Sequence, residues 1–147
     1  MKSICLRQKE RGFSLVELTI VVAILGVLAA LAIPTFMSSS AKAKQNEAQL
    51  ILKQIYEMQH TYRQEKDTYY PSDGSTVVFQ PGETIGPLYV EVASSARYSY
   101  SITGNRTSFT ATAGTKSATG LDDDPTADVW SIDQNGELTC VTNDAIR

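Results

Sequence analysis

The sequence predicts an α+β fold in which one long N-terminal helix packs on a C-terminal antiparallel sheet of about four strands. Residues 13–37 form an apolar run that continues, over residues 38–68, into apolar side chains recurring at helical spacing. Residues 69–147 are instead rich in Gly, Ser, Thr and Tyr, and contain short runs in which apolar and polar side chains alternate, as in half-buried strands.

Charge is distributed as unevenly as the apolar residues. The net charge of the 147 residues is −3, but residues 1–12 carry four basic side chains against one acidic. The remainder holds nine basic and fifteen acidic side chains. Because binding to DNA or RNA relies on clustered cations that face the phosphates, this acidic body disfavours a nucleic-acid partner.

The apolar run is long enough to cross a membrane. It holds 25 residues, and its polar positions before residue 33 are Ser14, Glu17 and Thr19. A helix of this length spans a hydrocarbon core of about 30 Å. The basic residues that precede it place residues 1–12 in the cytoplasm and the rest of the chain outside. A secretory signal peptide is a poorer interpretation, because its apolar region is shorter and is followed by a cleavage site.

Glu17 is unusual in such a segment, because a carboxylate inside a membrane is costly and rare without a function. One interpretation is that Glu17 reaches the headgroups at the cytoplasmic interface. A second is that it pairs with a cation. If the chain were cut after Gly12, the new amino group of Phe13 would lie one helical turn from Glu17, and the same group of a neighbouring copy could pair with it.

The stretch RGFSLVELTIVVAILGVLAALAIP, ending at Pro34, resembles the N-terminal segment of type IV prepilins and the related pseudopilins. The resemblance implies the pilin fold and cleavage between Gly12 and Phe13, which removes residues 1–12 as a leader. It also implies N-methylation of Phe13 and an assembly role for Glu17, which would pair with the Phe13 amine of an adjacent subunit.

The partners implied by the resemblance are other copies of the chain in a helical filament, a prepilin peptidase, and an assembly platform with an ATPase. The chain would first reside in the inner membrane, with its leader in the cytoplasm and its head outside. It would then become part of a pilus on the cell surface or of a periplasmic pseudopilus.

Two residues are expected to weaken the apolar helix. Pro34 lacks an N–H and clashes with the preceding turn, which predicts a kink, and Gly26 is a poor helix former. The resemblance implies that the segment between Gly26 and Pro34 loses helicity on assembly. Without the resemblance, Pro34 is an ordinary proline kink in a membrane helix.

Residues 38–68 are predicted to form the amphipathic second half of the helix, which would end near Lys66. His60 lies in this half, and because the chain has no second histidine for a catalytic or zinc site, it is expected to be solvated. The apolar positions that define the buried face are Ala48, Ile51, Leu52, Ile55, Met58 and Tyr62.

Residues 69–147 are predicted to form a β-rich head. One short strand is expected at Thr76–Gln80, and the rest of the stretch up to Pro87 is expected to be loop. Alternation around Tyr100, a Gly104-Asn105 turn and Phe109 predict a first hairpin. The runs at 128–133 and 136–141, which flank a Gln-Asn-Gly turn, predict a second hairpin.

The cysteines do not predict a disulfide. Cys5 lies in the basic leader and Cys140 near the far end of the chain, where it is expected to be a buried strand residue. Pilins often close their C-terminal loop with a disulfide, so the second hairpin or a bound ion would have to hold this C-terminus in its place.

An acidic loop is the candidate metal site. Several carboxylates in one short loop supply the oxygen ligands that Ca²⁺ prefers, although the spacing differs from that of an EF-hand and a solvated loop is the alternative. No catalytic motif is present, which predicts that the chain is not an enzyme. The candidate calcium ligands are Asp122, Asp123, Asp124, Asp128 and Asp133.

The function predicted from the sequence is a structural subunit of a type IV pilus that serves adhesion, motility or DNA uptake. The alternative within the family is a pseudopilin of a type II secretion system. The acidic loop favours the pseudopilin, whereas the absence of its Pro-Trp-Gly motif disfavours it. The alternative of a different class is an uncleaved, single-pass, membrane-anchored binding protein.

Overall fold

The computed structural model describes residues 12–115, 120–121 and 126–144. Most of the leader, including Cys5, and the candidate ligands Asp122, Asp123 and Asp124 therefore lie outside the described residues. The chain divides into two units, Met1–Phe36 and Met37–Arg147.

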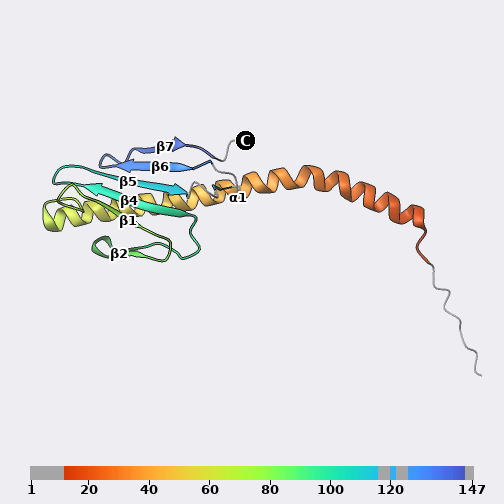
Figure 1. Ribbon diagram of the computed structural model, residues 1–147, viewed down its shortest axis with the longest axis horizontal. Helices are drawn as coiled ribbons and strands as arrows, with labels where there is room; N and C mark the ends of the chain where they lie inside the picture. The colour runs from red at the N-terminus through yellow and green to blue at the C-terminus, as the bar shows by residue number, and fades with distance from the viewer. Residues whose placement is uncertain (1–11, 116–119, 122–125, 145–147) are drawn as a thin grey trace, which may run out of the picture. The chain divides into compact units, whose positions relative to one another are not determined.

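Helix α1 (Leu15–Lys66) is 52 residues long, as the sequence predicts to within two residues at its start (Figure 1). At 1.5 Å per residue it measures about 78 Å. It stops at Asp67, whose φ of 59° is left-handed and whose N–H still donates to the Arg63 carbonyl at 2.8 Å. The helix is assigned through both Gly26 and Pro34. Its kink and its loss of helicity on assembly remain predictions.

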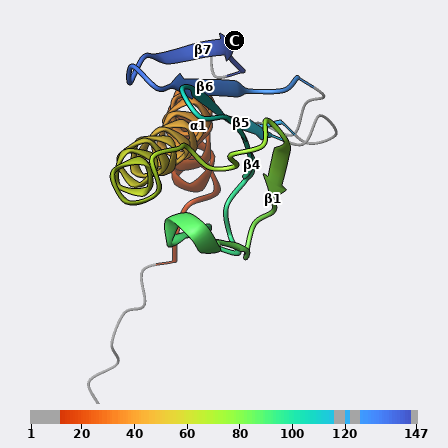
Figure 2. The ribbon, with the colours of Figure 1, turned by 90° about the vertical axis from the view of Figure 1, so that its left-hand side faces the viewer.

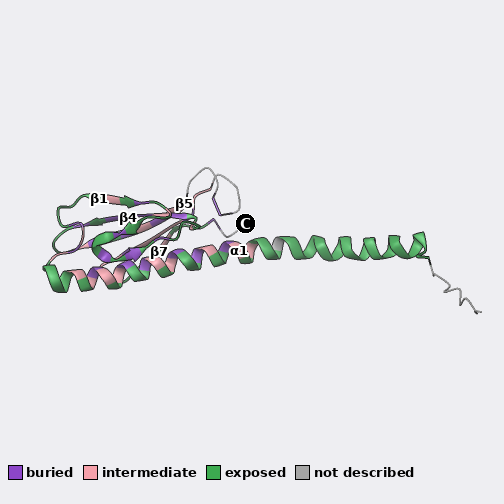
Figure 3. Ribbon diagram, turned by 90° about the horizontal axis from the view of Figure 1, so that it is seen from below, coloured by how far each residue is buried: buried purple, intermediate pink, exposed green. Residues whose placement is uncertain are grey.

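The two halves of α1 differ in burial (Figure 3). Every side chain from Phe13 to Ile33 is exposed, and among the described residues α1 is the one helix long and apolar enough to cross a membrane. From Ala41 onward the helix has a buried face. That face comprises Ala41, Gln45, Ala48, Leu52, Ile55 and Gln59.

The head contains an antiparallel sheet of five strands in the order β1-β4-β5-β6-β7, one more strand than the sequence estimate of about four (Figures 1 and 2). Both predicted hairpins are confirmed, as is the predicted strand near residue 76, which pairs with the edge of β4. The strands are β1 (Thr76–Phe79), β4 (Tyr98–Gly104), β5 (Phe109–Thr115), β6 (Val129–Asp133) and β7 (Leu138–Thr142).

A second, two-stranded sheet lies in a segment that the sequence predicted to be loop. It pairs β2 (Thr84–Ile85) with β3 (Val90–Glu91), around a short 3-10 helix η1 (Gly86–Leu88). Strands of two residues are too short to show an alternating pattern. The segment nevertheless contributes fully buried side chains to the core, namely Ile85, Leu88 and Val90.

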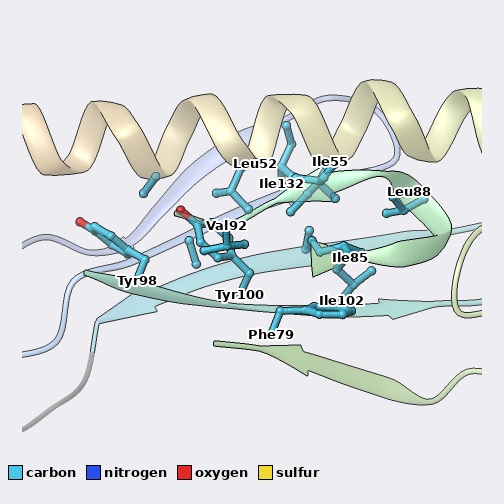
Figure 4. Packing of buried hydrophobic residues seen from close by; sticks show 14 of the residues in the cluster. Leu52, Ile55, Phe79, Ile85, Leu88, Val92, Tyr98, Tyr100, Ile102 and Ile132 are labelled. Carbon is cyan, nitrogen blue, oxygen red and sulfur yellow. The ribbon is translucent and has the colours of Figure 1, made fainter. Parts of the chain in front are cut away.

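The core fills the space between the second half of α1 and the inner face of the sheet (Figure 4). Leu52 and Ile55 of the helix pack there with Tyr100, Ile102 and Ile132 of the strands, and all five are at most 3% exposed. Burial of apolar area contributes about 25 cal/mol per Å², so this packing stabilises both the helix half and the sheet.

Gly104 ends β4 at a point of close approach between two segments. A Cβ at this position would lie 2.6 Å from the Tyr70 carbonyl oxygen, and the Gly104 carbonyl accepts a hydrogen bond from Gly74 N–H at 2.9 Å. No larger residue fits without moving that backbone. The absence of a side chain at position 104 therefore allows the segment that follows the helix to lie close against the first hairpin.

Two burial predictions are corrected by the structure. His60, expected to be solvated, is half-buried between the rings of Tyr56 and Tyr69, at centroid distances of 4.5 and 5.7 Å. Its position at the margin of the buried helix face explains this. Cys140, expected to be buried, is half-buried because β7 is an edge strand.

The outer face of the five-stranded sheet is rich in hydroxyl side chains. Alternation directs Tyr98, Tyr100 and Ile102 inward, so the intervening residues of β4 and their register partners face outward. The outward serines and threonines are Thr76, Ser99, Ser101, Thr103, Thr110, Thr112, Ser131, Thr139 and Thr142.

Candidate assembly segment and C-terminal clasp

The candidate assembly segment begins immediately before α1. Phe13 is 75% exposed and precedes the helix by two residues, and the first helical hydrogen bond runs from Leu18 N–H to the Ser14 carbonyl at 3.1 Å. Glu17 lies in the first turn, where a carboxylate interacts favourably with the helix dipole. Glu17 forms no ion pair with any other described residue.

The apolar half of α1 has side chains that nothing in the described chain covers. Leu15, Val22 and Leu25 are each more than half exposed, and the apolar surface extends around the whole helix. Exposed apolar patches larger than a few hundred Å² are uncommon on soluble monomers. This half of the helix therefore presents an apolar surface that apolar surroundings from outside the described chain would cover.

Gly12 and Gly26 are not required by the fold of the chain itself. A Cβ added at either position meets no atom within 4 Å, in contrast to Gly104. Any requirement for glycine at these two positions must come from another molecule or another state of the chain.

In the head, Asp128 is the centre of a buried hydrogen-bond network. Its carboxylate accepts hydrogen bonds at Oδ1 from Gln45 Nε2 (2.8 Å) and the Asp144 N–H (3.0 Å). At Oδ2 it accepts from the Tyr98 hydroxyl (2.6 Å) and Trp130 Nε1 (2.7 Å). An ionised carboxylate has about four acceptor positions, so the donors saturate a side chain that is 0% exposed.

This network holds the C-terminal segment against the helix and the sheet. The Asp144 carboxylate in turn accepts a hydrogen bond from the Leu121 N–H at 2.8 Å, while the Leu121 carbonyl accepts one from Lys44 Nζ at 2.8 Å. Gln45 also donates to Asn143 Oδ1 at 2.9 Å. We call these contacts around Asp128 and Asp144 the C-terminal clasp.

The clasp also explains the ionisation behaviour of Tyr98. Burial raises the pKa of the Tyr98 hydroxyl far above its ordinary value, and the hydrogen bond to Asp128 raises it further. At neutral pH Tyr98 is therefore protonated and can donate its hydrogen bond to Asp128.

Sequence reasoning identified Asp128 as an acid of the loop but not its partners at positions 45, 98, 130 and 144. The available signal was a polar residue on the apolar helix face. Gln45 is one such residue, and Gln59, two heptads later, is the other. Gln59 is fully buried and bonds both the N–H and the carbonyl of Tyr70, so each glutamine fastens a different part of the head to α1.

The structure separates two of the five candidate calcium ligands. Asp128 precedes β6 and Asp133 ends it, so at about 3.3 Å per residue they lie roughly 16 Å apart. Asp133 caps the β6–β7 turn, accepting hydrogen bonds from the N–H groups of Asn135 and Glu137. Among the described residues no group of three or more His, Cys, Asp or Glu side chains could hold a metal ion.

Residues 7–33 match the family described as "Prokaryotic N-terminal methylation motif". The chain is 52% identical over 61 residues to the type IV major pilin protein PilA of Myxococcus xanthus, covering 42% of this chain and 28% of PilA. It is 46% identical over 43 residues to the fimbrial protein EcpC of Eikenella corrodens, covering 29% and 28%.

A third relative is the type IV major pilin protein PilE1 of Neisseria gonorrhoeae, which is 48% identical over 42 residues, covering 29% of this chain and 26% of PilE1. These matches span between a quarter and a third of the length of each relative.

Proposed function

We propose that this chain, whose methylation motif and pilin matches support a place in the type IV pilin family, is a structural subunit of a type IV pilus. The observation that carries this proposal is the division of α1. Its first half is apolar and exposed on all sides, with an acid in its first turn, while its second half is built into a folded head. No enzymatic activity is proposed.

In this proposal a prepilin peptidase cleaves the chain after Gly12 and Phe13 is then N-methylated. Two observations support it. Residues 11–13 fall inside the matched motif, and the chain's own fold has no steric need for glycine at position 12. Glycine would then be required by the peptidase, which must bring the backbone close to its catalytic groups.

Before assembly the apolar half would lie in the inner membrane, with the leader in the cytoplasm and the head outside. During assembly the helices of many copies would bundle, which restores the apolar surroundings that leaving the lipid removes. Extraction from the bilayer requires work, which an assembly platform with an ATPase would supply. Local unwinding between Gly26 and Pro34 would let the helix adjust to its neighbours.

Glu17 would pair with the amino group of Phe13 on an adjacent copy. The support for this pairing is geometric. Phe13 and Glu17 lie at the same exposed end of the apolar segment, and Glu17 has no ion-pair partner among the described residues. A carboxylate entering an apolar bundle needs such a cation, because an unpaired buried charge is strongly unfavourable. The filament so formed would serve adhesion, motility or DNA uptake.

Intact-mass measurement of the protein purified from its own host tests the proposal. The expected result is a chain that begins at Phe13 and carries one added methyl group. An uncut chain would contradict the filament proposal and favour a membrane-anchored binding protein.

Deletion of the gene separates the two alternatives within the family. Loss of surface filaments would indicate a pilin, whereas loss of protein secretion with pili intact would indicate a pseudopilin.

For calcium, we propose that an ion would take its ligands from Asp122, Asp123 and Asp124, because Asp128 is saturated by the clasp and Asp133 by its turn. Calorimetry of the whole chain at millimolar calcium tests this. Heat uptake or release with a raised melting temperature is expected, and the absence of both would remove calcium from the proposed function.

A further inference from the structure

The turn between β6 and β7 contains an asparagine that is followed by a glycine. Asn135 and Gly136 are the single Asn-Gly pair of the sequence, because the other asparagines are followed by Glu47, Arg106 and Asp144. In such a pair the side-chain amide can be lost spontaneously, since glycine has no side chain to keep its backbone nitrogen away from the asparagine Cγ. Asn135 is exposed, so water reaches it.

The fold requires the glycine of this pair. Gly136 has a left-handed φ of 78°, and a Cβ at this position would lie 3.2 Å from the ring of Tyr56 in α1. A larger residue would strain the backbone and press against that ring. The turn therefore keeps a chemically reactive pair that replacement of the glycine cannot remove without a loss of stability.

Asp133 holds both of the groups that would react. The Gly136 N–H donates to the Asp133 carbonyl at 3.0 Å, and Asn135 Nδ2 donates to Asp133 Oδ2 at 2.9 Å. The N–H groups of Asn135 and Glu137 donate to Asp133 Oδ1 at 2.9 and 3.0 Å. Attack requires the Gly136 nitrogen to lose its proton and the Asn135 side chain to rotate until Cγ is within bonding distance. The hydrogen bonds of these two nitrogens must therefore break first.

We propose that Asn135 is a site of spontaneous deamidation and that Asp133 slows the reaction by holding the turn closed. The Gly136 nitrogen bonds to the Asn135 Cγ, the Cγ–Nδ2 bond breaks, and the amide leaves as ammonia with the proton of the Gly136 nitrogen. Water then opens the cyclic imide at one of its two carbonyl carbons, which leaves aspartate or isoaspartate at position 135.

Either product weakens the turn that delays its formation. A carboxylate at position 135 replaces the donor Nδ2 with an acceptor that faces the Asp133 carboxylate, and like charges at this distance repel. Isoaspartate also adds one methylene group to the main chain, which displaces Gly136 from Tyr56. Because this turn joins the edge strand β7 to the sheet, the modified hairpin opens more easily.

The test follows the mass of the whole chain, kept in detergent, during storage in mildly alkaline buffer. Exchange of –NH2 for –OH raises the mass, and peptide mapping assigns the gain to a residue and separates isoaspartate from aspartate. We expect a slow gain at Asn135 in the wild-type chain. Asp133→Ala should raise the rate roughly tenfold, because the open turn is more populated without its side-chain acceptor. In concentrated urea the two chains should react at the same rate.

Asp73→Ala is the matched control, because Asp73 is an exposed aspartate that accepts a hydrogen bond from the Ser75 N–H in a different turn. This variant should deamidate at the wild-type rate, and Asn135→Ser should show no gain in the β6–β7 turn. Asp133→Ser keeps one acceptor oxygen and should give an intermediate rate, which keeps the test valid should Asp133→Ala not fold.

Three results would each overturn the proposal. The first is a native wild-type chain that reacts as fast at Asn135 as the unfolded chain does, or a chain that does not react there even in urea. The second is a folded Asp133 variant that reacts at the wild-type rate. The third is equal acceleration by Asp73→Ala, which would mean that general loss of stability, and not release of this turn, controls the reaction.

Discussion

The two halves of helix α1 differ in what surrounds their side chains, although they form one continuous helix. In the second half, the positions that face the sheet are buried and most of the exposed positions are polar, Leu50 being an exception, so packing within the head limits which residues the buried positions can hold. In the first half every described side chain is exposed, so the fold of the single chain dictates almost nothing. The comparison indicates that residues of the first half are constrained by surroundings outside the single chain, which in the function proposed above are lipid and other copies.

The largest effect on the head is expected from Asp128→Ala. This change removes the acceptor of four hydrogen bonds, of which those from Gln45, Tyr98 and Asp144 are buried and that from Trp130 is part-buried. A buried donor left without an acceptor costs about 1–3 kcal/mol if no water replaces the carboxylate, so a loss of at least roughly 3 kcal/mol is expected. Urea unfolding followed by near-ultraviolet circular dichroism measures it. Asp133→Ala, at the exposed end of the same strand, is the control and should cost less. Equal losses would mean that the clasp adds no special stability.

The second prediction compares one leucine from each half of the helix. Leu52 is fully buried, so Leu52→Ala should destabilise the head by about 2–5 kcal/mol. Leu25 is 57% exposed, and Leu25→Ala should leave the stability of the head unchanged. Trp130, the single tryptophan, reports urea unfolding of the head by its fluorescence. Similar losses for the two variants would contradict the division of α1.

A smaller effect is expected from acid. Hydrogen bonds from the Glu137 and Asn135 N–H groups lower the pKa of Asp133 below its ordinary 3.8. A depressed pKa contributes stability that is present above the unfolded value and is lost as the pH falls through the folded value. Asp133→Asn should therefore reduce the difference in urea midpoint between pH 5 and pH 3. If the variant and the wild type lose stability in parallel over that range, the turn does not depend on the charge.

The smallest effect on the head, and a large one on assembly, is expected from Glu17→Gln. The substitution keeps the size of an exposed side chain that has no ion pair with another described residue, so the urea midpoint and cleavage after Gly12 should be unchanged. Incorporation into filaments, counted by electron microscopy, should fall strongly because the Phe13 amine loses its partner. Normal filaments from this variant would exclude the pairing.

The sequence predicts those parts of the fold in which apolar residues recur at a regular spacing. The helix was visible from its apolar spacing, and the two hairpins from alternation around a Gly-Asn and a Gln-Asn-Gly turn. Strands β2 and β3 were missed because two residues cannot display a period, although Ile85 and Val90 are fully buried. Hydrophobic spacing also said little about His60, which lies at the margin of the buried face.

The clasp was beyond sequence reasoning for a different reason. Asp128 meets partners that are 83, 30 and 16 residues away, and no local pattern encodes which polar groups meet at that distance. The one local clue was Gln45 among apolar residues on the buried side of the helix. A polar residue in such a position requires a partner, but its identity depends on the packed structure.

Because of the clasp, the described part of the head does not depend on a disulfide bond. The described C-terminal segment is held by hydrogen bonds to a carboxylate, and Cys140 is a free thiol. A head secured in this way needs no oxidant and no disulfide isomerase in order to fold, and a reductant has no crosslink to break among the described residues. Its fold is therefore compatible with reducing and oxidising surroundings alike.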